Sequence, residues 1–347
     1  MSTRHLIAGI VLAALGSLIA ADALAASPER PPARWRENYF PNVELTTHEG
    51  KSVRFYDDVI KDRVVAINFF FTSCKDVCPG ETARMRQVQQ LLGDRVGDDV
   101  FMYSITIDPE TDTPEEMAAY HKRFKLGPGW TFLTGKEEDL DLLQRKLGLL
   151  IEDLEDPNDH NVNLIIGNEA TGQWMTRSPY DNPNVLAKLL ANNLHNWKRP
   201  FGKEHQGYEV AKEIPNFSKG QFLFQSRCNA CHTIGQGEGV GPDLIGVAER
   251  REPKWLSRWL KEPDSMIAEG DPIALQILEQ YGDLRMPNLS LNDTDVSSVI
   301  EYLKSETVAV REKTAAEAIR PVVGEDDPHA AHRGHSAKKG HDAHAHH

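Results

Sequence analysis

The sequence of 347 residues predicts two folded units, an α/β domain followed by a small all-α domain. In the first half, between residues 39 and 197, short apolar runs typical of strands alternate with helix-like patterns. From residue 215 to 306 the pattern is helical, and no strand-like run interrupts it. The polar stretches 26–38 and 198–214 have the composition of linkers.

The run from Val64 to Phe71 is the clearest element of the first domain, because it is apolar enough to be a strand buried on both faces. Residues 100–107 and 162–166 are further strand candidates. Thr113 is placed to cap a helix in which Pro114 takes the first position. The other helices of this domain are expected after Pro79, near residues 140–150 and near residues 185–197. Alternating strands and helices indicate a layered fold with a central sheet.

The second domain is expected to begin its first helix at Ser218, which forms a capping box with Gln221. Its last helix is amphipathic, with an apolar face that includes Val299 and Leu303. Residues 307–347 are charged, rich in alanine and finally rich in histidine, so we expect a disordered tail. Histidine-rich tracts of this kind can bind copper, nickel or zinc weakly.

The N-terminus has the features of an export signal. A short polar start with Arg4 precedes an apolar run over residues 6–20, and Ala23-Leu24-Ala25 offers a cleavage site with small residues. The apolar run is shorter than the roughly 20 residues that span a bilayer. We therefore predict a signal peptide over residues 1–25 and a periplasmic protein, with membrane contact only if this segment stays uncleaved as an anchor.

The formal net charge of −13 narrows the choice of partner. Binding to nucleic-acid phosphates needs basic patches, so an acidic chain argues against nucleic acid as a partner. The same charge suits docking to a basic protein surface.

The chain contains four cysteines, which fall as two close pairs, Cys74/Cys78 and Cys228/Cys231. A scaffold stabilised by disulfides usually spreads its cysteines more widely, so two separate chemical sites are expected. With the adjacent His232, the second pair forms a C-x-x-C-H sequence, the attachment signal of a covalent c-type haem. The thiols reach the vinyl groups of one porphyrin, and the imidazole points to the iron. A zinc site would need a second ligand pair nearby, and the sequence has none. A thioredoxin-type disulfide would need a preceding buried strand, whereas residues 222–226 have a helical pattern.

Residues around this motif resemble class I cytochrome c domains over about residues 215–306. Gly241-Pro242-Asp243-Leu244 matches the loop that follows the haem-binding segment. The resemblance implies that the Pro242 carbonyl accepts a hydrogen bond from the His232 imidazole. It also implies Met286, which is followed by a proline in a loop before the last helix, as the second axial ligand of the haem iron; the rival is Met266. A His/Met pair suits electron transfer, because it raises the reduction potential and leaves no open site.

The pair Cys74/Cys78 lies where a buried strand gives way to a helix. Thiols at positions i and i+4 face the same side of that turn, and a helix N-terminus favours thiolate. Two thiolates are soft ligands that select copper(I) or zinc. From these residues alone, a disulfide, a thiol redox pair and a metal site remain as alternatives.

Three segments of the first domain, in order along the chain, support a family resemblance. They are residues 72–79 with the cysteines, residues 107–114 (IDPETDTP) and residues 127–135 (GPGWTFLTG). Over residues 39–197 the sequence resembles the Sco/SenC family of copper proteins. The resemblance implies a thioredoxin-like fold with a central mixed sheet.

The same resemblance implies Cys74, Cys78 and His160 as the ligands of one copper ion, the histidine lying in a loop before a strand. The sequence departs from the family pattern in having Asn161 after the histidine, where serine is usual. Asp108 is implied as a residue that supports the ligands; its alternative role is to form a turn at the end of a strand.

The combined resemblances imply a protein that delivers copper to the subunit of a haem–copper oxidase that carries the binuclear copper centre. The fused cytochrome would exchange electrons with a redox partner protein. The alternatives are a thiol–disulfide oxidoreductase that uses the haem as an electron conduit, and a redox sensor or simple electron carrier. Haem carries one electron, as the copper(II)/copper(I) couple requires, whereas a disulfide between Cys74 and Cys78 requires two.

Overall fold

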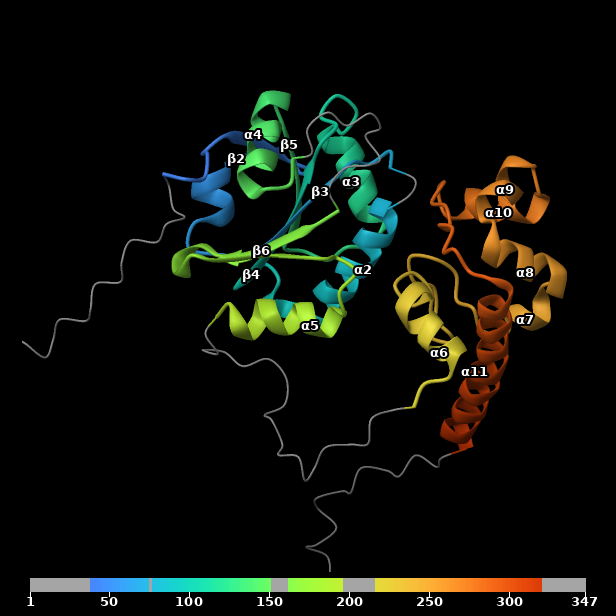
Figure 1. Ribbon diagram of the computed structural model, residues 1–347. Coiled ribbons are helices and arrows are strands. Elements are labelled where there is room, and N and C mark those ends of the chain that lie inside the picture. The colour runs from blue at the N-terminus through green and yellow to red at the C-terminus, as the bar shows by residue number, and fades with distance from the viewer. Residues whose placement is uncertain (1–37, 75–76, 151–161, 196–215, 320–347) are drawn as a thin grey trace, which may run out of the picture.

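The computed structural model describes residues 38–74, 77–150, 162–195 and 216–319. It contains an α/β domain in which helices flank a sheet, and a helical domain that follows it in the chain (Figure 1). Within the described ranges, no helix is long and apolar enough to cross a bilayer.

Seven strands form one mixed sheet in the order β2-β1-β5-β4-β3-β6-β7. The central strands β3, β4 and β5 run parallel to one another, and the other neighbours pair antiparallel. The strands are β1 (Glu44–Thr47), β2 (Ser52–Arg54), β3 (Val64–Phe70), β4 (Val100–Thr106), β5 (Trp130–Gly135), β6 (Leu164–Asn168) and β7 (Gln173–Arg177). The central mixed sheet expected for the first domain is therefore confirmed.

Strand β3 lies between β4 and β6, and all seven of its residues are buried. Successive side chains of a strand point to opposite faces, and β3 follows this rule. Ala66 and Phe70 belong to the apolar core on one face, whereas Ile67 and Phe69 belong to the core on the other. The one polar residue of the strand, Asn68, accepts a hydrogen bond from the Ser104 hydroxyl of β4.

Helices cover both faces of this sheet. The face that carries Ala66 is covered by α2, α3 and α5, and the opposite face is covered by α4. Their bounds are α2 (Val77–Leu92), α3 (Pro114–Arg123), α4 (Glu137–Leu147) and α5 (Pro183–Lys188), which continues as the π-helical segment η5 (Leu189–Asn193). Thr113 caps α3 as expected, since its hydroxyl accepts a hydrogen bond from the Glu116 backbone N–H.

The second domain is helical over its described residues. Its elements are α6 (Lys219–Leu223), η7 (Phe224–Cys228), α7 (Val247–Arg250), α8 (Pro253–Lys261), α9 (Pro263–Ala268), α10 (Pro272–Gln280) and α11 (Asp293–Ile319). Helices α6 and α11 pack closely because Gly220 has no side chain: a Cβ there would lie 2.0 Å from the Ser298 carbonyl oxygen. Ser218 caps α6 through the Gln221 backbone N–H, as the capping box predicts.

The last helix extends beyond residue 306, where the sequence predicts the start of a disordered tail. Thr307 is buried, and its hydroxyl accepts a hydrogen bond from the Gly246 backbone N–H. One turn later, Arg311 donates two hydrogen bonds to Glu249. These contacts with the start of α7 continue the helix to Ile319, and only residues 320–347 of the expected tail lie outside the described residues.

Candidate metal and haem sites

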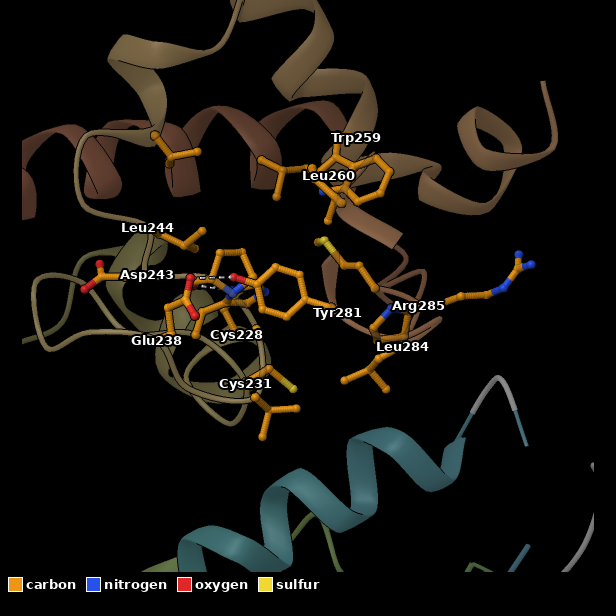
Figure 2. A pocket seen from close by; sticks show the side chains of 18 of the residues that line it. Cys228, Cys231, Glu238, Asp243, Leu244, Trp259, Leu260, Tyr281, Leu284 and Arg285 are labelled. Atoms are coloured by element: carbon orange, nitrogen blue, oxygen red, sulfur yellow. Dashed lines mark hydrogen bonds between the residues drawn. The ribbon is translucent and has the colours of Figure 1, made fainter. Parts of the chain in front are cut away.

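The C-x-x-C-H segment borders an apolar cavity of about 340 Å³ in the helical domain (Figure 2). The backbone N–H groups of Cys231 and His232 both donate to the Cys228 carbonyl, which folds the segment into a tight turn. As a result, both sulfurs and the imidazole lie at the wall of one cavity. Its other walls carry the indoles of Trp255 and Trp259, which are stacked with ring centres 5.4 Å apart. An apolar cavity with two thiols and an imidazole at one wall fits a covalently attached haem.

The ring of His232 is held in place from behind. Its Nδ1 lies 2.9 Å from the Pro242 carbonyl oxygen, the contact that the resemblance to cytochrome c implies. Burial lowers the pKa of His232, so the neutral ring donates through Nδ1 and keeps Nε2 as a lone-pair donor. Gly241 allows the ring this position, because a Cβ there would lie 2.7 Å from the imidazole Cε1.

The two methionines proposed as axial ligand have different surroundings. Met286 lines the cavity together with His232. Met266 is not among the lining residues and is buried in an apolar cluster with Trp259 and Ala274, against which Met286 also packs. A sulfur that faces the cavity can approach an iron atom held there. The structure therefore favours Met286 over Met266, although its role as a ligand stays a prediction.

Cys74 and Cys78 lie at the junction between β3 and α2, and both are buried. The Cys78 backbone N–H lies 3.4 Å from the Cys74 sulfur, so the two side chains share one turn, and no disulfide joins them. The hydrogen bond with Cys74, together with burial, raises the pKa of the Cys78 thiol. This outweighs the effect expected from the helix N-terminus, so the thiol pair keeps a proton until a cation replaces it.

The loop that enters Cys74 is fixed by Asp112, which lies in the second family motif. Its carboxylate accepts hydrogen bonds from the backbone N–H of Thr72 at 3.1 Å and from the hydroxyls of Thr72 and Thr106. Burial raises the pKa of Asp112, and these hydrogen bonds oppose the rise. Asp108, which the resemblance implies as a support, instead accepts from the Thr111 N–H within the turn after β4. Asp112 therefore positions the loop that enters Cys74, and Asp108 forms a turn after β4, which is its alternative role. The support that the resemblance implies for Asp108 stays a prediction.

A buried carboxyl group that the sequence does not single out lies one turn beyond Cys78. Glu81 is only 1% exposed, and neither carboxyl oxygen has a hydrogen-bond partner in the part of the chain that the structure describes. Burial, with the nearby Cys74 as the second cause, raises its pKa from 4.5 to about 9. Glu81 is therefore a neutral acid at pH 7.

Glu81 predicts a pH dependence of stability for the copper-free, reduced protein. Between pH 4.5 and pH 9 the folded state keeps a proton that the unfolded chain releases, so stability falls as pH rises. The upper limit is about 1.4 kcal/mol per pH unit. We expect Glu81→Gln to flatten the decrease in melting temperature between pH 5 and pH 8.5. Thermal unfolding followed by circular dichroism measures this, with exposed Glu110→Gln as the control; equal slopes in all three proteins would contradict the prediction.

The third predicted copper ligand, His160, lies outside the described residues. Of the other histidines, His48 and His121 have no partner pattern in the sequence and would be expected to face solvent, but they are half-buried. Their rings stack with centres 4.7 Å apart. His48 accepts a hydrogen bond from the Phe132 N–H, which holds it against the edge of the sheet. The pairing joins the turn after β1 to α3 and has no signal in the local sequence.

The cavity of the helical domain reaches the α/β domain at the first turn of α2. Pro79 and Gly80, the two residues after Cys78, line the cavity together with Cys228 and Cys231. Ala230 and Val240 of the helical domain are buried in the same apolar core as Cys78. The two predicted sites are therefore neighbours, a relation that the sequence leaves open.

Fold and sites together define a two-domain redox protein, in which a mixed-sheet α/β domain with a buried thiol pair adjoins a helical domain built to hold haem. The family described as SCO1/SenC matches residues 33–195, and the family described as Cytochrome c matches residues 217–307. The chain belongs to the SCO1/SenC family and carries a cytochrome c domain. A cytochrome c domain implies a haem group.

Three relatives illustrate this relationship. A putative copper-binding protein of Stutzerimonas stutzeri is 30% identical over 166 residues, which cover 45% of this chain and 79% of that protein. An SCO2-like protein of Rickettsia conorii is 30% identical over 180 residues, covering 48% of this chain and 85% of the relative. The solved cytochrome c domain of a Pseudomonas putida protein is 47% identical, covers 28% of this chain and 94% of its own, and has a TM-score of 0.26.

Proposed function

We propose that this chain is a periplasmic copper-delivery protein for the binuclear copper centre of a haem–copper oxidase. In the α/β domain, Cys74, Cys78 and His160 would hold one copper ion. In the helical domain, Cys228 and Cys231 would hold one haem covalently. A human relative, a mitochondrial SCO1 homologue, is 39% identical over 168 residues, which cover 46% of this chain and 53% of that protein.

The residues of the helical domain supply a one-electron centre. His232 and Met286 would ligate the haem iron, and Pro242 would orient the imidazole through its carbonyl oxygen. When bound, the haem supplies a single-electron couple, which matches the copper(II)/copper(I) couple of the neighbouring domain. Trp259 and the other apolar residues around the cavity exclude water, which favours electron transfer over oxygen chemistry.

One observation carries the proposal: the buried thiol pair stands at the first turn of α2, and the next residues line the haem cavity. Thiolates buried away from water are suited to a soft cation such as copper(I). Burial also limits attack by these thiols on the disulfide of a partner protein, since Cys74 and Cys78 are at most 5% exposed. This disfavours the thiol–disulfide oxidoreductase that the sequence leaves as an alternative.

A copper titration tests the proposal. Reduced protein that lacks residues 320–347, and therefore the histidine-rich tract, is expected to bind one copper(I) ion tightly. The loaded protein should then pass copper to the copper-free soluble domain of an oxidase subunit, whose binuclear centre reports its formation by visible absorption. Protein that binds no copper but reduces partner disulfides would be an oxidoreductase. Protein that does neither would be an electron carrier or sensor.

A further inference from the structure

Arg84 of α2 places a buried cation at the boundary between the two domains. The residue is only 7% exposed, and its guanidinium donates hydrogen bonds to the Ser226 carbonyl oxygen and, at 3.3 Å, to the Asn229 side-chain oxygen. Asn229 lies between the two haem-attachment cysteines. Burying a guanidinium is unfavourable unless hydrogen bonds replace those it made with water. The contacts with Ser226 and Asn229 therefore favour the arrangement in which the helical domain lies against α2.

Gln87 extends the same contact by one helical turn. Its side-chain amide donates to the Asn229 backbone carbonyl at 2.9 Å and to the Asn229 side-chain oxygen at 3.2 Å. Residues at i and i+3 lie on the same face of a helix, so Arg84 and Gln87 can both form hydrogen bonds with Asn229. Arg84 also donates to Gln87 at 3.0 Å, which fixes the two side chains relative to each other. We call these two side chains the α2 clamp.

The α2 clamp joins the two predicted redox sites through one helix. Cys78 and Arg84 are six residues apart on α2, which is roughly 9 Å along a helix axis. At the other end of the clamp, Cys231 packs against the core of the α/β domain, and Figure 2 shows it at the end of the cavity that faces α2. An electron at the haem-attachment segment therefore has a short path to the thiol pair through the core that Cys231 packs against.

We propose that Arg84 and Gln87 are positioning residues that hold the haem against α2, so that electrons pass between haem and copper within one chain. The step would transfer one electron: ferrous haem would become ferric and copper(II) would become copper(I), with no covalent bond formed or broken and no proton moved. The electron-transfer part rests on the proposed function, since it requires bound copper. The clamping of the two domains requires neither copper nor delivery.

Full-length protein with haem and copper(II) bound tests the route. The haem is reduced by a light pulse with a soluble photoreductant, and its reoxidation is followed by visible absorption at several protein concentrations. We expect a first-order rate that is independent of protein concentration. In the double variant Arg84→Met, Gln87→Leu this rate should fall at least tenfold. Arg95→Met is the matched control, because this buried arginine pairs with Asp99 inside its own domain and should leave the rate unchanged.

Small-angle scattering of copper-free protein separates the clamp from the proposed function. The double variant should show a larger radius of gyration than the wild type, with an unaltered haem spectrum as proof that the helical domain is folded. Arg84→Lys keeps the positive charge but lacks the planar guanidinium, so its radius of gyration should lie between those of the wild type and the double variant. An unchanged radius overturns the clamp, and a larger radius with a wild-type transfer rate overturns the route. If the wild type binds no copper, the proposed function fails, while the scattering result still decides the clamp.

Discussion

Replacing Cys78 with serine is expected to weaken copper(I) binding by about a hundred- to a thousandfold. Four-ligand structural zinc sites bind with roughly 10–16 kcal/mol, so one ligand is worth roughly 2.5–4 kcal/mol. The serine hydroxyl is a hard donor that matches copper(I) poorly, and Cys78 is fully buried, so water has little access to replace the lost sulfur. Competition with a chromophoric copper(I) chelator measures the affinity.

The neighbouring Ser73→Ala provides the control, because this side chain is exposed on the same loop and is not a soft donor. The pH dependence gives a second test. Because the hydrogen bond with Cys74 and burial raise the pKa of Cys78, copper must displace a proton from the thiol pair at pH 7. Affinity for copper(I) should therefore increase as pH rises, and this increase should be smaller in Cys78→Ser. Wild-type affinity in Cys78→Ser would refute the thiol site.

The residues that the sequence reveals are those whose chemistry is encoded locally. The C-x-x-C-H turn and the spacing of Cys74 and Cys78 are short-range patterns, so they are visible without a fold. Strand β3 is predictable for a similar reason, since burial on both faces leaves a continuous apolar run. Strands β1 and β2 are missed because their short, partly polar segments become strands only by pairing with each other and with β5.

The residues that the sequence hides are polar groups whose role depends on tertiary burial. Glu81, Arg84 and Gln87 are polar residues on one amphipathic helix, where such residues usually face solvent. Two of them instead meet the second domain, and the third lies behind the thiol pair. Asp112 is hidden for another reason: the motif that contains it also contains Asp108, and the sequence alone does not show which of the two aspartates supports the cysteine loop. Only the fold shows that Asp112 reaches Thr72 across 40 positions of sequence.

Met286→Ala is expected to lower the haem reduction potential by on the order of a few tenths of a volt, since axial ligands set potentials over about 0.8 V. Loss of the thioether sulfur removes a ligand that favours ferrous iron, and the sulfur–iron charge-transfer band should disappear with it. Visible spectroscopy during a redox titration of the holoprotein measures both quantities.

Met266→Ala is the matched control for this variant, because it removes an equal side chain from a neighbouring cluster. Met266 is almost fully buried among apolar residues, so its loss should destabilise the helical domain by about 2–5 kcal/mol while the band and the potential persist. The two variants thus separate ligation from packing. Met286→Ala should change the spectrum and potential of the haem iron without a large loss of stability, and Met266→Ala should lower stability without changing the spectrum or the potential. If the band vanished in Met266→Ala and survived in Met286→Ala, the cavity-facing position of Met286 would have to be explained by packing alone, and the ligand assignment would pass to Met266.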